Sequence, residues 1–425
     1  MRWIALTLYN GLWLVAPSLL KRYLRKRAQR APAYLEHWSE RFGAPLAQPC
    51  QRPIWLHAVS VGETRAAYPL ILALKAYYPD APLLLTQMTP TGRQTAEALY
   101  PEAQCRYLPY DKPAYVRQFF QEHQPLFGVI METELWPNLL HEAKAQGVLM
   151  CLANARLSAR SLAGYLKVKA LIQPAVAQFG LVCAQAPTDA ERLSQLGALS
   201  PIVCGSSKYD MPIPPAMHTL SHTFRQRSGQ RPVVVCASTR YVNDEQDEAE
   251  LLLQAWQTYA NPDNALLVIV PRHVERFDAV VASAEALGFK VQRRSDEQAI
   301  AADTQVWVGD SMGELFAYYL AADMAFVGGS LVDTGCQSII EPLIAGLPTL
   351  FGPSTYNFAQ VSQDVLSANA AIQVSSAQAW QHQVAQLLGQ PLVRQDLKDR
   401  AHAFIQQHQG ASQKMATLIH ARHTA

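Results

Sequence analysis

The chain has 425 residues, of which 49% are hydrophobic and 16% are charged, and its formal net charge at pH 7 is +2. This composition is typical of well-packed α/β domains and excludes a disordered chain, while the near-neutral charge gives no support for a nucleic-acid partner. The length predicts two domains, because a single hydrophobic core rarely serves more than about 250–300 residues. The seven cysteines occur singly, without a C-x-x-C pair. That pattern favours reduced thiols over disulfides or a structural zinc site.

The chain opens with an uncharged segment, Trp3–Leu20, which is followed at once by the basic stretch Lys21–Arg30. Eighteen helical residues would reach about 27 Å, just short of a hydrocarbon core of about 30 Å. A signal peptide carries its positive charge before the apolar run, so this order argues against one. Basic residues beside an apolar segment favour attachment to anionic lipid and retention on the cytoplasmic side. We therefore predict a membrane-anchor helix with a basic flank at 1–30, either spanning the bilayer or lying in its interface. A buried core helix is the alternative.

Beyond this segment, short apolar runs alternate with helical patterns, as in parallel sheets that carry helices on both faces. In the first half, the predicted strands and their following turns lie within 54–74, 82–92, 126–137, 147–158 and 179–197. A break follows at Tyr209–Leu220, where three prolines interrupt any regular element and predict an interdomain linker. In the second half, the corresponding segments are 231–240, 265–277, 305–319, 322–332 and 347–358.

These patterns predict two Rossmann-like α/β domains, an N-terminal one at 31–210 and a C-terminal one at 211–425. In such folds ligands bind at the carboxyl ends of the strands, and we expect a cleft between the two domains. This is the layout of the GT-B glycosyltransferases.

The second half carries the features expected of a nucleotide site. The glycine pair 328–329 follows a predicted strand, and a helix is predicted to begin near Gln337, where free amides and the helix dipole can receive a phosphate. Glu341, one turn into that helix, can accept hydrogen bonds from ribose hydroxyls. Arg272 and Lys208 are candidate cations for a phosphate or a carboxylate. No G-x-x-x-x-G-K-[ST] loop occurs, which argues against a phosphate-hydrolysing NTPase.

Several carboxylates of the sequence can act either in the chemistry or in the fold. Glu63 lies in the turn between the first predicted strand and its helix, where a carboxylate can cap the helix or serve as a catalytic base. Glu132 and Glu134 follow a buried predicted strand. Metal-dependent sugar transfer would require clustered carboxylates, and the only dense acidic run, Asn243–Glu250, is explained by acidic residues that open a helix. We therefore expect neither a metal nor another cofactor.

Seven motifs occur in an order that resembles the 3-deoxy-D-manno-octulosonic acid (Kdo) transferases of lipopolysaccharide synthesis, over nearly the whole chain. They are SVGE (60–63), METELWP (131–137), NARLS (154–158), GSSKYD (205–210), VPRHVERF (270–277), GDSMGEL (309–315) and GGSLV (328–332). The resemblance implies a GT-B fold, CMP-Kdo as the donor, and the lipid A precursor lipid IVA as the acceptor. It implies further that the domain at 31–210 binds the acceptor and the domain at 211–425 binds the donor. It also implies inversion at the anomeric carbon, one or more Kdo residues transferred without metal, and a place on the cytoplasmic side of the cell inner membrane.

Carried over by position, the resemblance implies that Glu63 is the general base and that Glu132 and Lys208 stabilise charge. Glu134 competes with Glu132, and only the resemblance favours Glu132. The implied contacts to CMP are Pro271, Arg272, Met312, Gly313, Glu314, Ser338 and Glu341.

Three positions depart from the family pattern. The family usually has Gly-Gly-His-Asn where this chain has Gly335-Cys336-Gln337-Ser338, and it often has His at the positions of Arg240 and Ser354. A phosphate cradle made of backbone amides is compatible with all three changes, whereas side-chain contacts from the missing His and Asn are lost.

Two other functions fit a chain of this class. One is a GT-B transferase of the cytoplasmic face that uses a UDP-sugar and a lipid acceptor. The other is a nucleotide-sugar epimerase or a non-catalytic sensor with the same fold. The apolar N-terminus argues against the epimerase, which needs no lipid-facing segment, and the full set of motifs favours CMP-Kdo over a UDP-sugar.

Overall fold

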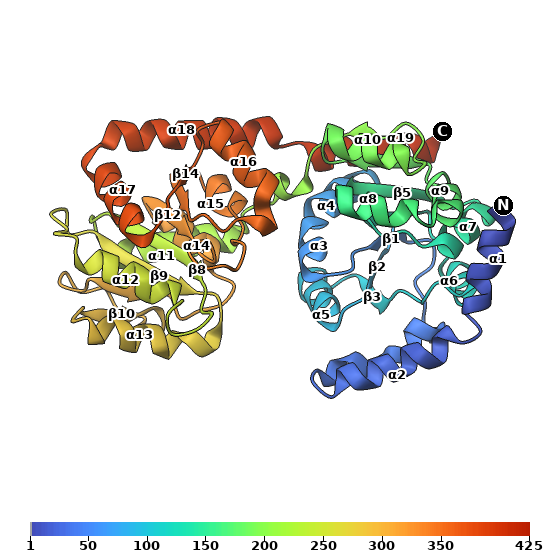
Figure 1. Cartoon of the computed structure of the whole chain (residues 1–425), viewed down its shortest axis with the longest axis horizontal. Helices are drawn as coiled ribbons and strands as arrows, with labels where there is room; N and C mark the ends of the chain where they lie inside the picture. Colours follow the sequence, from blue (N-terminus) through green and yellow to red (C-terminus); the bar gives the residue numbers. More distant parts are fainter. Residues whose placement is uncertain (1) are drawn as a thin grey trace. The chain divides into compact units, whose positions relative to one another are not determined.

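The computed structural model describes residues 2–425, and the chain divides into two compact units (Figure 1). Unit 1 comprises Met1–Met211 and Gln409–Ala425, and unit 2 comprises Pro212–His408. Each unit contains a seven-stranded parallel sheet. The predicted pair of α/β domains is therefore confirmed.

The sheet of unit 1 has the strand order β3-β2-β1-β4-β5-β6-β7. Its strands are β1 (Ile54–His57), β2 (Leu83–Gln87), β3 (Gln104–Tyr107), β4 (Phe127–Met131), β5 (Leu149–Ala155), β6 (Leu181–Ala184) and β7 (Ile202–Val203). The helices that follow them are α3 (Val61–Ala66), α4 (Tyr68–Tyr77), α5 (Pro90–Leu99), α6 (Pro113–His123), α7 (Pro137–Ala145), α8 (Ala159–Leu166), α9 (Lys169–Val176) and α10 (Pro187–Gln195). The order of the strands reverses between β1 and β4, which makes the carboxyl ends of these two strands the expected place for a ligand.

The sheet of unit 2 has the order β10-β11-β9-β8-β12-β13-β14. Its strands are β8 (Val233–Thr239), β9 (Leu266–Pro271), β10 (Val291–Arg293), β11 (Val306–Val308), β12 (Met324–Val327), β13 (Thr349–Phe351) and β14 (Ile372–Gln373). Its helices are α11 (Pro215–Ser228), α12 (Glu248–Gln257), α13 (Phe277–Ala286), α14 (Leu315–Ala321), α15 (Ile340–Ile344), α16 (Ala359–Ser367), α17 (Ala377–Gly389) and α18 (Pro391–His408).

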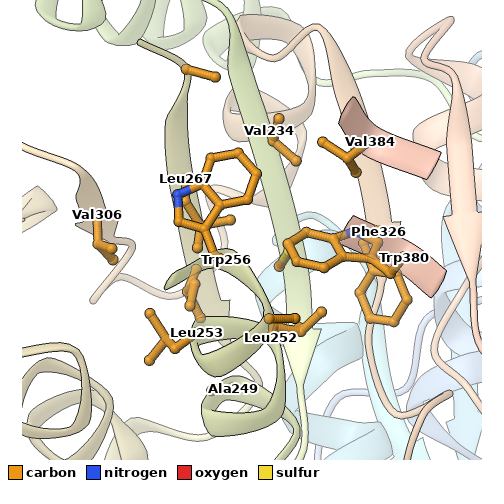
Figure 2. Close-up of a cluster of buried hydrophobic side chains, with 14 of the residues drawn as sticks. Val234, Ala249, Leu252, Leu253, Trp256, Leu267, Val306, Phe326, Trp380 and Val384 are labelled. Carbon is orange, nitrogen blue, oxygen red and sulfur yellow. The ribbon is translucent and has the colours of Figure 1, made fainter. Parts of the chain in front are cut away.

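The central strands are buried on both faces, which explains their continuous apolar runs. In β8, Val234 belongs to the cluster drawn in Figure 2, whereas Val233 and Val235 pack into a second cluster on the other face of the sheet. Trp256 of α12 and Trp380 of α17 lie in the first cluster, with ring centroids 5.9 Å apart (Figure 2). Aromatic side chains of this size contribute much of the apolar area that a core buries.

The last helix, α19 (Ala411–Thr424), belongs to unit 1 rather than to unit 2. It packs against α4, and Met415 and Ile419 lie in the core cluster of that unit. The Asp210 carboxylate accepts the N–H groups of Gly410 and Ser412, each at 2.6 Å, at the start of the helix. The structure thus differs from the expected domain at 211–425, because residues 409–425 return to the first unit.

The N-terminal segment forms two helices instead of one, α1 (Arg2–Leu12) and α2 (Ala16–Ala28). Pro17 lies in the first turn of α2, a position that suits proline at a helix start and disfavours a continuous helix through it. Among the described residues no single helix is long and apolar enough to cross a bilayer. The two helices meet that criterion only as a pair bent by 48°.

Candidate active site

Glu63 is held at the start of α3, directly after β1. Its Oε2 accepts the Val59 N–H at 2.8 Å, and its Oε1 accepts the Ser60 hydroxyl at 2.9 Å. Ser60 is the N-cap of α3 and accepts the Glu63 N–H, so the two residues bond reciprocally, much as in a capping box. Burial raises the pKa of Glu63, the bonds from Val59 and Ser60 lower it, and the charges of Glu132 and Lys208 act in opposite directions. A half-buried carboxylate with a fixed orientation and a raised pKa is a suitable proton acceptor near neutral pH.

Glu132 and Lys208, which the resemblance groups together, form an ion pair. Lys208 Nζ lies 3.3 Å from Glu132 Oε1, and both side chains remain partly exposed. Glu132 follows β4 and has φ +57°, a left-handed conformation that is uncommon for residues other than glycine. Such backbone conformations cluster at functional sites, where the surrounding structure maintains them.

Glu134, the competing carboxylate, lies in the same loop and accepts the indole N–H of Trp136 at 3.0 Å. Burial, and secondly the charge of Glu63, raise the pKa of Glu134 to about 7, while the bond from Trp136 lowers it. Glu132 therefore pairs with the lysine, whereas Glu134 is influenced by the negative charge of Glu63. The two glutamates have different electrostatic environments although only one residue separates them.

The raised pKa of Glu134 predicts a pH-dependent effect of Glu134→Gln on stability. A folded-state pKa of about 7, above the value of about 4.3 expected in the unfolded chain, means that the folded protein loses stability as pH rises between these values. The variant should therefore gain up to about 2 kcal/mol over the wild type at pH 8, and almost nothing at pH 4, after allowance for partial exposure. Thermal unfolding at the two pH values measures the difference. An equal change at both values would contradict the assignment.

In unit 2, the glycine pair follows β12 and lies close to the end of β8. A Cβ on Gly328 would come within 2.6 Å of the Ser238 carbonyl oxygen, so no side chain fits there. Gly329 has φ +70°, which favours glycine. Arg240 and Gln337 border Gly329, and Arg240 Nη1 lies 2.7 Å from His273 Nε2. Polar residues that follow β8, β9 and β12 therefore lie close together.

The backbone amides of residues 329–331, which follow β12, are bonded to a buried carboxylate. The buried carboxylate of Glu248, at the start of α12, accepts the N–H groups of Gly329, Ser330 and Leu331 at 2.5, 3.0 and 2.9 Å. It also accepts the Arg240 N–H at 3.1 Å. Burial raises the pKa of Glu248 more than these four hydrogen bonds lower it.

The helix predicted near Gln337 begins later, at Ile340, and is only five residues long. The N–H groups of Gly335, Cys336 and Gln337 bond to the Ser354 hydroxyl and to the carbonyls of Gly329 and Gly328. The helix thus begins three residues later than predicted, because the chain at 335–337 folds back on the glycine pair. The phosphate site expected at the N-terminus of this helix stays a prediction. Of the residues implied there, Ser338 is half-buried before the helix, and Glu341 lies in its first turn within electrostatic reach of Tyr319.

The other residues implied to contact CMP lie at the end of β9 and in the loops after β9 and β11. Pro271 is the last residue of β9, and Arg272 after it is exposed and makes no ion pair with any residue of 2–425. Met312 is exposed, and Gly313 has φ +82°. The Glu314 carboxylate accepts two hydrogen bonds from Arg294, both of 3.1 Å, so its side chain is already paired within the chain.

Sequence reasoning missed the roles of Glu248 and Asn154. Glu248 was explained only as an acidic residue that opens a helix, which it also does. Asn154, the first residue of the NARLS motif, is buried, has φ +52°, and accepts the Ser207 N–H at 3.0 Å. The one local signal was the position of Asn154 at the end of a predicted strand.

Comparison with known proteins identifies relatives along nearly the whole chain. Residues 36–211 match the sequence profile described as 3-deoxy-D-manno-octulosonic-acid transferase (kdotransferase). A 3-deoxy-D-manno-octulosonic acid transferase of Bordetella pertussis is 40% identical over 93% of this chain and 94% of its own. The enzyme of the same description from Haemophilus influenzae is 34% identical over 97% of both chains.

A solved structure supports the fold. The UDP-GlcNAc 2-epimerase of Neisseria meningitidis, bound to UDP-GlcNAc, covers 87% of this chain and 99% of its own with a TM-score of 0.59, at 13% identity. At that identity the likeness concerns only the fold. The fold and the relatives together define a glycosyltransferase with the GT-B fold. Within that class, the chain belongs to the 3-deoxy-D-manno-octulosonic acid transferase family.

Proposed function

We propose that the protein transfers Kdo from CMP-Kdo to lipid IVA, with inversion at the anomeric carbon and without a metal ion. The observation that carries this proposal is the fixed carboxylate of Glu63 at the β1–α3 turn, within electrostatic reach of the Glu132–Lys208 pair. Membership of the Kdo transferase family supports the choice of Kdo as the transferred sugar.

The chemistry assigns a separate task to each of these groups. The bond between the anomeric carbon of Kdo and the CMP phosphate oxygen breaks, and a bond forms to the acceptor hydroxyl oxygen. Glu63 takes the proton of that hydroxyl, since inversion requires attack from the face opposite the leaving group. Because the anomeric carbon is tertiary and carries a carboxylate, positive character develops beside a negative group. Glu132 stabilises the positive character, and Lys208 balances the negative charge of the Kdo carboxylate or of the departing phosphate.

In unit 2, the donor contacts assigned by resemblance suit an anionic nucleotide. Arg272, exposed and without an ion-pair partner among residues 2–425, supplies the positive charge for the CMP phosphate. Met312 and Gly313 supply an exposed loop for the base or ribose, and Glu314 acts through its backbone because its side chain is bonded to Arg294.

Incubation with labelled CMP-Kdo and tetra-acylated lipid IVA tests the proposal directly. The expected product is lipid IVA carrying Kdo, and mass spectrometry after exhaustive reaction gives the number of residues added. A parallel incubation with UDP-GlcNAc tests the alternative transferase. Transfer from the UDP-sugar with none from CMP-Kdo would overturn the proposal.

We further propose that α1 and α2 attach the enzyme to the cytoplasmic face of the inner membrane by lying in the interface. One side of α1 packs against the rest of unit 1, since the helix contacts α9 and the Tyr9 hydroxyl donates to Asp111 at 2.9 Å. Trp13, directly after the helix, is buried. Large apolar side chains are exposed elsewhere on the two helices and in the break between them: Ile4, Leu8, Leu12, Leu14, Val15, Leu19 and Tyr23. The basic residues of 21–30 follow them. An exposed apolar stripe beside basic residues is typical of a helix that lies in a lipid interface.

Leu8→Glu should weaken this attachment by at least about tenfold, because a charged group replaces a buried apolar contact with lipid. Sedimentation with vesicles that contain anionic phospholipid measures the bound fraction. Leu392→Glu is the matched control, since Leu392 is also an exposed leucine but lies in unit 2. Equal binding of the two variants would contradict attachment through α1.

A further inference from the structure

Asn154 connects the end of β5 to the segment that carries Lys208. The side chain is fully buried, and its Oδ1 accepts the backbone N–H of Ser207 at 3.0 Å. Ser207 begins a short 3-10 helix, Ser207–Asp210, in which Lys208 is the next residue. The side chain of Asn154 therefore fixes the backbone from which the Lys208 ammonium group extends.

The backbone at Asn154 departs from regular strand geometry, and its side chain reaches Ser207 from this irregular position. Its φ of +52° lies in the left-handed region, which asparagine tolerates better than most residues. The register between β5 and β6 shifts between Leu152 and Ala155, on either side of it. Irregularities of this kind redirect side chains and are frequent beside active sites.

The partner of Lys208 is fixed from the same place. The N–H of Glu132 donates to the carbonyl of Ala153, the residue before Asn154, at 3.0 Å. Lys208 Nζ lies 3.3 Å from Glu132 Oε1. Both members of the ion pair are thus positioned by residues 153 and 154 of β5.

The arrangement has a cost in stability. Asn154 Nδ2 and Ser207 Oγ are both buried and have no hydrogen-bond partner within residues 2–425. Buried polar atoms without partners are rare in folded proteins because they lose hydrogen bonds to water. Asparagine at this position keeps the Ser207 N–H paired although its own Nδ2 stays unpaired, so the side chain serves the position of the Ser207 backbone.

We propose that Asn154 is a positioning residue of the transfer reaction, which holds Lys208 in its charge-balancing orientation through the Ser207 N–H. This inference rests on the role proposed above for Lys208. Asn154 touches neither sugar in this scheme and acts only through the segment it supports.

The test compares Asn154→Gly, Asn154→Asp and Lys208→Met in the full-length enzyme, with CMP-Kdo and lipid IVA as substrates. Glycine adopts a positive φ without strain and keeps the backbone bonds of residue 154 to Met415 and Gln185, so only the side chain is lost. Asn154→Gly should lower kcat about 10–100-fold with little change in KM, since small displacements of charge-stabilising groups cost this much. The melting temperature should fall moderately, because the buried Ser207 N–H loses its acceptor. Asn154→Asp, which keeps the acceptor oxygen, should recover most of the activity. Asn369→Gly is the control, because Asn369 also has a positive φ (+50°) but is exposed in unit 2.

The double variant Asn154→Gly/Lys208→Met separates this inference from the proposed function. If Asn154 acts through Lys208, the double variant has the kcat of Lys208→Met alone. If Lys208→Met is impaired but the loss from Asn154→Gly is absent or multiplies with it, the inference is overturned and the role of Lys208 stands. If Lys208→Met keeps its activity, the proposed role of Lys208 fails, and the positioning role fails with it.

Discussion

Glu63→Gln should lower kcat about 10²–10⁴-fold, which is the usual contribution of a general base. The variant keeps a similar shape but cannot take the proton of the acceptor hydroxyl. Its folding should change little, because one amide oxygen still accepts either the Val59 N–H or the Ser60 hydroxyl, and the lost contact is worth about 1 kcal/mol. Affinity for CMP-Kdo should be retained, since the implied contacts to CMP lie in unit 2 and Lys208 is unchanged.

Ser60→Ala is the matched control for the structural role of the same turn. It removes the N-cap of α3 and one contact to Glu63 but leaves the carboxylate in place. If Glu63 were only a capping residue, the two variants would lose similar stability and similar activity. If Glu63 is the general base, Ser60→Ala should lose about 1 kcal/mol of stability yet keep most of its turnover. Near-wild-type turnover of Glu63→Gln would exclude the base.

The pH dependence of turnover adds an independent measurement of Glu63. Its pKa is raised, chiefly by burial, so activity should fall as pH drops through a value above that of a free glutamate, about 4.3. In Glu63→Gln the residual activity should lack this acidic decrease. An acidic limb that persists unchanged in the variant would assign the titration to another group.

The sequence predicted those features that depend on neighbours in the chain. The sheets were predictable because parallel strands buried on both faces give continuous apolar runs, such as Leu83–Leu85 and Val233–Val235. The position of Glu63 was predictable because Ser60 and Glu63 are three residues apart, the spacing of a capping box. The break of the N-terminal segment was signalled by Pro17, although a single helix was expected there.

Features that depend on residues distant in sequence were not predictable. Helix α19 was assigned to the wrong domain because its anchor, Asp210, lies 200 residues earlier in the chain. The contact that holds the 329–331 loop was not predictable for the same reason, since the carboxylate that binds its amides comes from Glu248, 81 residues before Gly329. Neither contact leaves a local pattern, and both become visible only when the sheets are assembled.

Glu248→Ala is expected to lower the free energy of unfolding of unit 2 by about 3 kcal/mol. The substitution leaves four backbone N–H groups without their acceptor, at about 1–3 kcal/mol for each that stays buried, while relief from burying a charge offsets part of this loss. Urea unfolding measures the change in the free energy of unfolding. Hydrogen exchange of the folded protein measures the protection of the loop amides at 329–331. Loop amides that stay as protected as in the wild type would contradict the assignment.

Glu250→Ala is the matched control, because Glu250 lies in the same first turn of α12 but is not buried. Both substitutions remove a charge that favours the helix dipole, worth about 0.3–1 kcal/mol, so the difference between them reports the loop contacts alone. Since the same carboxylate holds the backbone of Arg240 and Gly329, Glu248→Ala should also weaken binding of CMP to the enzyme, whereas Glu250→Ala should not. If Glu248→Ala is destabilised to the expected extent but binds CMP as tightly as the wild type, the 329–331 loop does not contribute to CMP binding. Binding of CMP would then depend on Arg272 and the Met312–Glu314 loop.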